Sequence, residues 1–262
     1  MGSQTALITG ASAGIGKVFA EKLAARGYNL ILTSRRKHLL DLHAEAYTHT
    51  HRVSVETIAA DLSSESGIDA VIERINNCDN LTLLINNAGF GTPGRFHEYD
   101  INRQKDMLQV HVWAAIRLIH ACLPGMIAQK KGNIINVASV ASFTPSPTSG
   151  TYCASKAYLT MLSESLTMEY HDEGIVVQSL CPGFTRTEFH DAAGYTDEEM
   201  AKIPKWMWLS AEKVVDDSLA GMKKKKVIVV PGKIYKLIVW LFRAPVFGWL
   251  MRRHMLSHRN ER

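Results

Sequence analysis

Three residues near the middle of the chain have the types needed to move a proton. Ser139, Tyr152 and Lys156 lie in the stretch SVASFTPSPTSGTYCASKAY, directly after the apolar run NIINVA. On a helix, residues four apart share one face, so the Tyr152 phenol and the Lys156 ammonium would lie together. An adjacent ammonium favours the phenolate and moves the Tyr pKa from about 10 toward neutrality. The pair predicts a general acid/base, although this spacing alone is more often an ordinary pair on a helix surface.

A second group of residues has the spacing of an anion-binding turn. The stretch ALITGASAGIGKVFA has the pattern of a strand, a glycine-rich turn and the start of a helix. Gly10, Gly14 and Gly16 would let the backbone approach a phosphate, and the amides that open the helix would face it. The spacing G-x-x-x-G-x-G differs from the usual dinucleotide fingerprint. We predict a dinucleotide pyrophosphate here, with a plain strand-to-helix turn as the alternative.

The ends of the next two strands predict which dinucleotide binds. The stretch LTSRRK ends the second strand with Arg35 and Arg36 and contains no acid. An acid there binds the 2′-hydroxyl of NAD(H), whereas an Arg accommodates the 2′-phosphate of NADP(H). The sequence therefore favours NADP(H) over NAD(H), unless the two Arg only form a solvated helix start. Asp61 ends the third strand, where ligands of open α/β sheets bind; its alternative role is to cap a helix.

The elements that must position these residues alternate along the chain. Apolar runs of strand type occupy residues 6–9, 30–33, 53–60, 81–86, 133–138, 175–181 and 227–230. Helical spacing covers residues 15–26, 66–76, 103–129, 152–172 and 211–222. Because the strand runs are not alternating, both faces of each strand should be buried. We predict an α/β fold, a Rossmann-type doubly wound sheet of about seven parallel strands with helices on both faces, in a single domain.

Two segments interrupt this alternation. Residues 183–210 form a long loop region, which in a compact domain is typical of a lid or binding loop. Residues 233–262 form an aromatic and basic extension after a catalytic domain of residues 1–232. In the extension, a helically spaced apolar stripe is formed by Ile234, Leu237, Ile238, Leu241 and Phe242. Lys236 and Arg243 fall on the opposite side of that helix.

Charge is distributed unevenly between the body and the extension. The net charge of the chain is +5, yet from Lys223 onward eleven Lys/Arg and one acid give a balance of +10. An acidic body with no binding motif argues against a nucleic-acid partner. For the extension, two interpretations stay open. It docks on an anionic membrane surface, or it packs over the substrate pocket or at a subunit interface.

Cysteine usage and the N-terminal stretch bear on the compartment. The four cysteines are scattered and form no C-x-x-C, so we expect reduced thiols, no disulfide framework and no metal. The stretch MGSQTALITG lacks the pattern of a secretory signal, and no uninterrupted apolar run reaches the roughly 18 residues of a spanning helix. We expect a cytoplasmic protein, with peripheral membrane association through residues 233–262 as the open alternative.

Five motifs together resemble one enzyme family. They are TGASAGIG (9–16), NNAG (86–89), Ser139, YCASK (152–156) and CPGFTRT (181–187). Their order and spacing over roughly residues 4–230 are similar to those of the short-chain dehydrogenases/reductases. More loosely, the chain is similar to the branch of ketoreductases and 3-oxoacyl and 17β-hydroxysteroid reductases.

The resemblance implies a function and a role for each central residue. It implies an NAD(P)-dependent oxidoreductase of a small-molecule carbonyl or alcohol, assembled as a homodimer or homotetramer. Tyr152 would be the catalytic acid/base, Ser139 would hold the substrate carbonyl oxygen, and Lys156 would bind the nicotinamide ribose and lower the Tyr pKa. Matched by position, the implied cofactor contacts are Gly10, Ser12, Ala13, Gly14, Ile15, Gly16, Arg35, Asp61, Leu62, Asn87, Gly89, Tyr152, Lys156, Gly183, Thr185 and Thr187.

One catalytic position departs from the family pattern. The family usually carries Asn in the helix before the serine-bearing strand, and this chain has His111 there, in MLQVHVWAAIRL. In the family, the main-chain carbonyl at this position holds a relay water and the side chain helps to fix a kink. His111 either supports the relay in place of Asn, or is an ordinary core histidine, or marks a degraded site with slow turnover.

The substrate class follows from aromatic residues around the motifs. They are Phe90, Phe96, Phe143, Phe184, Phe189, Tyr195, Trp206 and Trp208, with Met207 among them. An apolar pocket built from them would suit a lipophilic ketone, such as a 3-oxoacyl chain or a steroid-like ketone. A polar substrate, such as a sugar or small diketone, is an alternative. A catalytically weak NADP(H)-binding sensor or scaffold is an alternative of another class.

Overall fold

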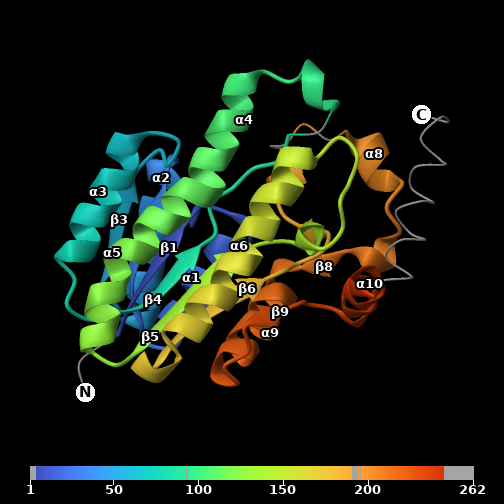
Figure 1. Cartoon of the computed structure of the whole chain (residues 1–262). Helices are drawn as coiled ribbons and strands as arrows, with labels where there is room; N and C mark the ends of the chain where they lie inside the picture. Colours follow the sequence, from blue (N-terminus) through green and yellow to red (C-terminus); the bar gives the residue numbers. More distant parts are fainter. Residues whose placement is uncertain (1–3, 93, 191–193, 195, 245–262) are drawn as a thin grey trace.

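A seven-stranded sheet with helices on both faces forms the body of the protein (Figure 1). The computed structural model describes residues 4–92, 94–190, 194 and 196–244. All seven strands are parallel, in the order β3-β2-β1-β4-β5-β6-β9. This confirms the predicted single doubly wound domain. The strands are β1 (Thr5–Thr9), β2 (Asn29–Ser34), β3 (Val55–Ala59), β4 (Leu81–Asn86), β5 (Gly132–Val137), β6 (Ile175–Leu180) and β9 (Ile228–Val229).

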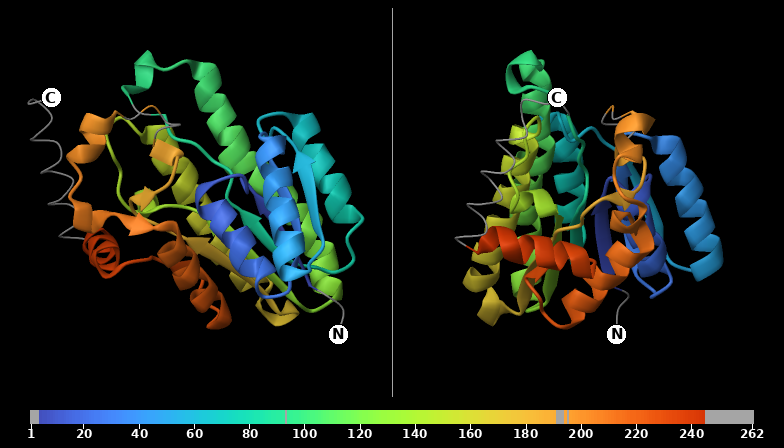
Figure 2. Two further views of the ribbon diagram at one scale, coloured as in Figure 1. Left: turned by 180° about the vertical axis from the view of Figure 1, so that it is seen from behind. Right: turned by 90° about the vertical axis from the view of Figure 1, so that its right-hand side faces the viewer.

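Alternate residues of each central strand feed two separate cores. In β1, Ala6 and Ile8 pack toward one core and Leu7 toward the other. The first core includes α1 (Gly14–Ala24), α2 (Lys37–His51) and α9 (Ala211–Lys223). The second includes α3 (Glu65–Asn76), α5 (Ala114–Ala128) and α6 (Gly150–Glu169). Figure 2 shows these two helix layers on opposite sides of the sheet. Burial on both faces explains why the strand runs are continuously apolar.

The strand order alone predicts where a binding crevice lies. The chain runs outward from β1 through β2 to β3, then returns to the other side of β1 with β4. At such a reversal, the loops that leave neighbouring strands diverge and open a crevice at the carboxyl ends. The glycine turn follows β1 and the NNAG motif follows β4, so both motifs stand at this crevice.

One long helical stretch contains a π-helical segment at its centre. α4 (Ile101–Leu108) continues through a π-helix at Gln109–Trp113 into α5. By length and mean hydropathy alone, the stretch Ile101–Ala128 could cross a membrane. Its apolar side instead packs on the sheet, and Leu118 and Met126 are fully buried. We interpret it as a core helix whose path is shifted at the π-helix.

The structure contains elements that the sequence analysis did not predict. α2 was missed because only Leu40 and Tyr47 of its fifteen residues are buried, which leaves little apolar periodicity. The region 183–210 is not an irregular loop throughout. It contains β7 (Thr185–Arg186) paired with β8 (Leu209–Ser210), and the short helix α8 (Asp197–Ala201).

The C-terminal extension begins with a helix that packs against the body. α10 (Lys233–Arg243) buries Tyr235, Val239 and Phe242. Of the predicted stripe, Phe242 is buried and Ile234 and Ile238 pack against the body, whereas Leu237 is 50% exposed. The Tyr235 hydroxyl accepts a hydrogen bond from the Phe184 N–H at 3.0 Å and donates one to the Met207 carbonyl at 2.6 Å. Tyr235 thus joins α10 to both ends of the region 183–210.

Candidate active site

A single cavity collects most of the residues that the sequence predicts as functional. Its volume is about 660 Å³, and it opens at the carboxyl ends of the central strands. The predicted residues that line it are Gly10, Ser12, Ala13, Gly14, Ile15, Arg35, Asp61, Leu62, Asn87, Gly89, Ser139, Tyr152, Lys156, Gly183, Thr185 and Thr187. Gly16 and His111 lie behind this lining. Residues from seven separate parts of the sequence therefore meet in one place.

The glycine turn is shaped by close backbone contacts. Gly10 and Gly14 have φ values of 64° and 54°, which residues with a Cβ rarely adopt. A Cβ on Gly16 would overlap the Gly10 carbonyl. Asn87 fixes the turn from the NNAG side, since its Nδ2 donates to the carbonyls of Thr9 and Gly10 at 2.9 and 3.1 Å. The N-terminus of α1 consequently faces the cavity, with the Thr187 side chain beside Gly14, and its backbone amides suit a phosphate.

The end of β2 presents two cations, and they differ in their contacts. Arg36 donates to Ser12 Oγ from Nε at 3.1 Å and from Nη2 at 3.0 Å. Its Nη1 also lies 2.8 Å from the Glu188 carboxylate. Arg35 lines the cavity as well and is exposed. The sequence singled out Arg35, and the structure adds Arg36 as a second cation beside the glycine turn.

Asp61 is held in place by the residues that follow it. Its Oδ1 accepts hydrogen bonds from the N–H and the hydroxyl of Ser63, at 3.0 and 2.8 Å. Partial burial would raise the pKa of this carboxyl, but the Ser63 hydrogen bonds and the charge of Arg35 together lower it. Ser64, and not Asp61, caps α3 by accepting from the Gly67 N–H. Asp61 is thus an ionised group that is available to the cavity.

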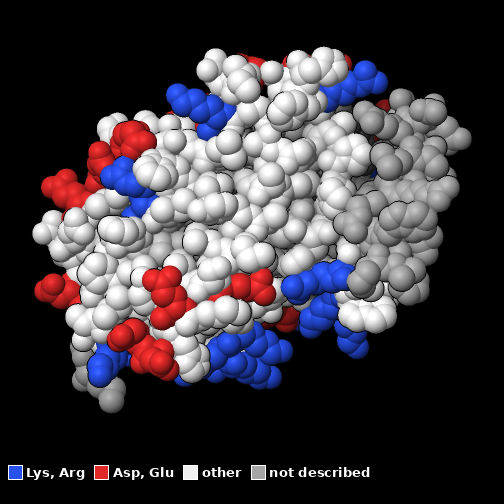
Figure 3. All heavy atoms as spheres, viewed as in Figure 1, with Lys and Arg blue, Asp and Glu red and all other residues white. Residues whose placement is uncertain are grey.

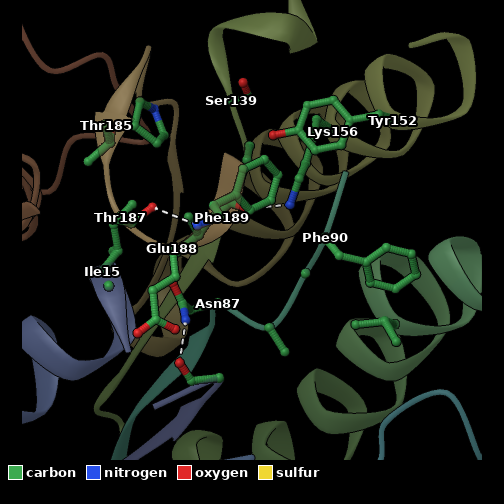
Figure 4. Close-up of a pocket in the computed structure, with 18 of the residues that line it drawn as sticks. Ile15, Asn87, Phe90, Ser139, Tyr152, Lys156, Thr185, Thr187, Glu188 and Phe189 are labelled. Carbon is green, nitrogen blue, oxygen red and sulfur yellow. Dashed lines mark hydrogen bonds between the residues drawn. The ribbon is translucent and has the colours of Figure 1, made fainter. Parts of the chain in front are cut away.

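The three central side chains meet at one end of the cavity. Ser139 follows β5, and Tyr152 and Lys156 lie one turn apart on α6. Figure 4 shows the Tyr152 hydroxyl turned toward the middle of the cavity, with the Lys156 amine near its ring. Lys156 Nζ is 5.7 Å from the Tyr152 ring centroid. Ser139 Oγ accepts from the Ala141 N–H at 3.1 Å, which leaves the hydroxyl proton for another acceptor.

Lys156 is a buried ammonium with one carbonyl partner in the described structure. It is 4% exposed, and its Nζ donates to the Val137 carbonyl at 2.9 Å. Burial lowers the pKa of this amine to about 8, from an ordinary value of 10.5. The ammonium is therefore still charged at pH 7 but close to losing its proton. A residue tuned in this way is typical of catalytic sites.

His111 connects the NNAG motif to the helix that carries Tyr152. It is 1% exposed and lies in the π-helix. Its Nε2 accepts from the Phe90 N–H at 3.0 Å, and its Nδ1 lies 2.9 Å from Ser155 Oγ. Ser155 Oγ in turn donates to the Tyr152 carbonyl at 2.8 Å. Because Nε2 is an acceptor, we assign the proton of the neutral ring to Nδ1, so that every group in this chain is satisfied.

Burial and the neighbouring charge keep His111 neutral. Burial first, and then the ammonium of Lys156, lower its pKa well below the ordinary 6.5. A Cβ on Gly89 would lie 2.8 Å from His111 Nε2, so the glycine of NNAG makes room for the ring. His111 therefore positions the site through hydrogen bonds. Its ring does not line the cavity, and its placement among the catalytic residues stays a prediction.

The low pKa of His111 predicts a pH-dependent stability. Between the folded pKa and about 6.5, the unfolded chain binds a proton that the folded chain does not, so stability falls as pH falls. The slope from this group is at most about 1.4 kcal/mol per pH unit. We expect His111→Asn to remove that part of the slope, as measured by urea unfolding at pH 7, 6 and 5. His120→Asn, an exposed histidine on α5, is the matched control; equal slopes in all three proteins would contradict the prediction.

Several residues in the cavity were not predicted as cofactor or catalytic contacts. Arg36 was named together with Arg35 at the end of the second strand, but it was not among the matched cofactor contacts. Glu188 and His190 belong to no recognisable sequence motif. They line the cavity because they follow β7, which leads the chain across it. Their contacts join positions far apart in the chain, as in the pair between Arg36 and Glu188, which are 152 residues apart. Local sequence patterns do not contain such pairings.

Only some of the aromatic and other large residues predicted for the pocket line the cavity. Phe90, Phe184 and Phe189 line the cavity. Trp208 packs behind it, with its ring 5.6 Å from that of Phe184. Phe96 and Trp206 are instead 69% and 66% exposed and do not line the cavity. Phe143 and Met207 belong to the apolar cluster under α10, and Tyr195 lies outside the described residues.

Sequence comparisons match most of the chain. A family model described as short chain dehydrogenase matches residues 4–198. Hydroxysteroid dehydrogenase-like protein 1 of Gallus gallus is 32% identical over 266 residues, which cover 97% of this chain and 78% of that protein. The human protein named inactive hydroxysteroid dehydrogenase-like protein 1 is 38% identical over 184 residues, covering 70% and 56%. A very-long-chain 3-oxoacyl-CoA reductase of Pyrenophora tritici-repentis is 37% identical over 179 residues, covering 66% and 52%. The matches thus span only about half the length of the last two proteins.

Solved structures are similar over nearly the whole chain. A short-chain dehydrogenase from Sphingobium yanoikuyae in complex with NADPH has a TM-score of 0.83 and 32% identity, covering 97% of this chain and 95% of that chain. The bulky-bulky ketone specific alcohol dehydrogenase from Comamonas testosteroni has a TM-score of 0.80 and 30% identity, covering 98% and 95%. A short-chain dehydrogenase/reductase from Burkholderia phymatum in complex with NAD has a TM-score of 0.81 and 25% identity, covering 93% and 94%. Proteins of this fold thus bind either nicotinamide dinucleotide.

Proposed function

Because the chain belongs to the short-chain dehydrogenase family, we propose that it is an NADP(H)-dependent oxidoreductase that reduces a lipophilic ketone to an alcohol, or catalyses the reverse reaction. One observation carries the proposal. Ser139, Tyr152 and Lys156 line the same cavity as the glycine turn from Gly10 to Gly14. A group that can move a proton and a turn suited to a pyrophosphate therefore share one site.

Each of the three central side chains has its own task in this reaction. When bound, the dinucleotide supplies or accepts the hydride. Tyr152 donates its phenol proton to the carbonyl oxygen as charge develops there, and takes it back in the reverse direction. Ser139 donates a hydrogen bond to the same oxygen, since the Ala141 N–H already occupies its acceptor side. The Lys156 ammonium stabilises the phenolate that remains on Tyr152.

The cavity fits a dinucleotide with a 2′-phosphate. A Cβ on Gly10 would lie 2.8 Å from Asn87 Nδ2, so a glycine at this position lets the NNAG segment pack directly on the turn. Arg35 and Arg36 line the adenosine end, and two cations at the end of β2 suit a phosphate better than a 2′-hydroxyl. Asp61, after β3, would accept hydrogen bonds from the adenosine. These contacts favour NADP(H) over NAD(H).

The walls of the cavity favour a bulky apolar ketone. Phe90, Phe184 and Phe189 supply aromatic surface around the end of the cavity where Tyr152 lies. Most of a lipophilic ligand's surface can be buried in a cavity of this kind. The names of similar proteins include a very-long-chain 3-oxoacyl-CoA reductase and a bulky-bulky ketone specific alcohol dehydrogenase. Both names agree with a large substrate, although each belongs to that protein alone.

The reaction is tested by following NADPH oxidation with ketones graded in chain length, with NADH in parallel. We expect kcat/KM to rise with apolar length and to be higher with NADPH. A small diketone and a keto sugar serve as polar controls. A polar substrate that exceeds the long ketones in kcat/KM would contradict the lipophilic assignment, and a preference for NADH would contradict the cofactor assignment.

A catalytically weak NADP(H) sensor is the second candidate. Two observations favour it: His111 takes the usual Asn position, and the human relative is named inactive. The presence of Ser139, Tyr152 and Lys156 in one cavity favours the enzyme, because a sensor has no need of all three. Tight NADPH binding without turnover of any ketone in the graded series would support the sensor.

We include in the proposal a peripheral contact with an anionic membrane through α10. Its inner face is buried, and its outer face carries Trp240 at 62% exposure and Leu237 at 50%. Lys233 and Lys236 are exposed on the same helix. Figure 3 shows Lys and Arg gathered over the lower part of the molecule near α9 and α10, with some Asp and Glu beside them and others over α3. Aromatic and cationic side chains on one helix face suit the surface of an anionic bilayer.

The membrane contact predicts selective binding to vesicles. We expect the protein to sediment with vesicles that contain phosphatidylserine and not with purely zwitterionic ones. Trp240→Ala should weaken the binding several-fold, because a Trp at the interface contributes apolar contact. Leu42→Ala, a change of a 60% exposed residue on α2, is the control. Equal loss in both variants, or equal binding to both vesicle types, would contradict the proposal.

A further inference from the structure

Residues 187–189 cross the cavity from the glycine turn to the catalytic tyrosine. Thr187 packs on the turn, since a Cβ on Gly14 would lie 3.0 Å from its side chain. At the other end, the Phe189 ring centroid lies 6.0 Å from that of Tyr152. Figure 4 shows Thr187, Glu188 and Phe189 around the middle of this cavity. The segment therefore touches both ends of the proposed reaction site.

Glu188 holds this segment to the end of β2 through Arg36. Its Oε2 lies 2.8 Å from Nη1 of Arg36. The other edge of the guanidinium donates twice to Ser12 Oγ, at 3.1 and 3.0 Å. Arg36 therefore links three parts of the site: the glycine turn, the end of β2 and the segment 187–189.

A 2′-phosphate at the end of β2 would bind the same guanidinium. The planar donors of Arg suit a phosphate, and charge-assisted bonds to it are strong. A carboxylate that stays on Arg36 would repel the phosphate at short range. The side chains of Arg36 and Glu188 are 43% and 61% exposed, so their pair is screened by solvent and readily exchanged.

We infer that Glu188 is a specificity-determining residue that competes with the 2′-phosphate of the dinucleotide for Arg36. NADP(H) takes the place of the carboxylate and releases the segment 187–189, including Phe189 beside Tyr152. NAD(H) has no phosphate at this position, so the pair persists and the segment stays held. This inference rests on the proposed binding of NADP(H).

The competition is tested by measuring NADP⁺ and NAD⁺ binding calorimetrically, without turnover. We expect Glu188→Gln to tighten NADP⁺ binding about 3- to 10-fold and to change NAD⁺ binding by less than about 2-fold. The gain should disappear when Arg36→Ala is combined with it and should remain when Arg35→Ala is combined with it. Glu198→Gln, which removes the same charge from an 87% exposed side chain, is the control. Equal gains for both dinucleotides, or a gain that survives Arg36→Ala, would overturn the inference.

Release of the segment is tested by hydrogen exchange of the amides from residue 186 to residue 190. In the unmodified protein, exchange should be faster with saturating NADP⁺ than with saturating NAD⁺. In Glu188→Gln, exchange should be equally fast with both. Equal exchange in the unmodified protein would overturn the release step.

Adenosine 2′,5′-bisphosphate separates this inference from the proposed reaction. It carries the phosphate that Arg36 would bind but has no nicotinamide. Tighter binding of this probe to Glu188→Gln, together with absent ketone turnover, would support the competition and reject the reaction. Turnover that prefers NADPH, together with an unchanged affinity for the probe, would reject the competition and keep the reaction.

Discussion

Replacing Tyr152 with Phe is expected to lower kcat for ketone reduction by about 10²- to 10⁴-fold, the usual contribution of a positioned general acid. The change removes one oxygen and keeps the ring, so the contacts with Phe189 and His111, at centroid distances of 6.0 and 5.8 Å, should remain. The Kd for NADPH should therefore change little. The measurement is single-turnover kinetics with a saturating ketone, alongside NADPH binding.

Tyr158→Phe is the matched control for this experiment. Tyr158 lies on the same helix and is 43% exposed, so loss of its hydroxyl should leave kcat unchanged. Turnover of Tyr152→Phe within tenfold of the unmodified protein would remove Tyr152 from the role of general acid. A large loss of NADPH affinity would indicate that the hydroxyl serves mainly in binding.

Replacing Lys156 with Met should lower activity without lowering stability at pH 7. We expect kcat to fall by about 10²-fold or more, because the ammonium no longer stabilises the phenolate of Tyr152. The folded pKa of Lys156 is about 8, below the ordinary 10.5. Burial of this charge therefore costs roughly 3 kcal/mol of folding free energy at pH 7. Met avoids that cost and loses only the hydrogen bond to the Val137 carbonyl, worth about 1 kcal/mol.

The sign of the pH effect gives a second test of Lys156. Between pH 8 and 10.5 the unfolded chain binds the proton and the folded chain does not, so the cost of burying this group shrinks as pH rises and is gone above about 10.5. Below about pH 8 the amine is charged in both the folded and the unfolded chain, so the free-energy cost of burying it keeps its full value. Turnover should decline above about pH 8, where the ammonium loses its charge. Lys213→Met, which removes an exposed cation of α9, should affect neither property; a Lys156→Met protein that is clearly less stable at pH 7 would contradict the argument.

The sheet could be predicted because its signals are local. Runs such as LTLLIN and NIINVA are apolar throughout, and β4 and β5 coincide with them to within one residue. The sites at the strand ends followed from the same runs, since parallel strands bring their carboxyl ends to one edge. α2 was missed for the opposite reason. Only Leu40 and Tyr47 of this helix are buried, so its sequence shows almost no apolar periodicity.

The rest of the site could not be predicted because it depends on tertiary contacts. The position of His111 was identified by comparison with the family, but its hydrogen bonds to Phe90 and Ser155 depend on the π-helix that turns the ring inward. The stripe predicted for α10 was wrong at Leu237, which is 50% exposed. Tyr235, which the sequence analysis did not include in the stripe, is buried, and its hydroxyl has two backbone partners inside the protein. The roles of Ser139, Tyr152 and Lys156 stay predictions, although their meeting in one cavity is now part of the structure.

The contact between Tyr235 and Gly183 bears on how this protein can be shortened or fused. A Cβ on Gly183 would overlap the Tyr235 ring, so the ring fills the space that this glycine leaves beside the cavity. The first turn of α10 therefore packs directly behind Gly183, which is part of the cavity wall. An expression boundary placed at residue 232 would remove this packing. A shortened or fused form of the protein should therefore keep α10 through Arg243.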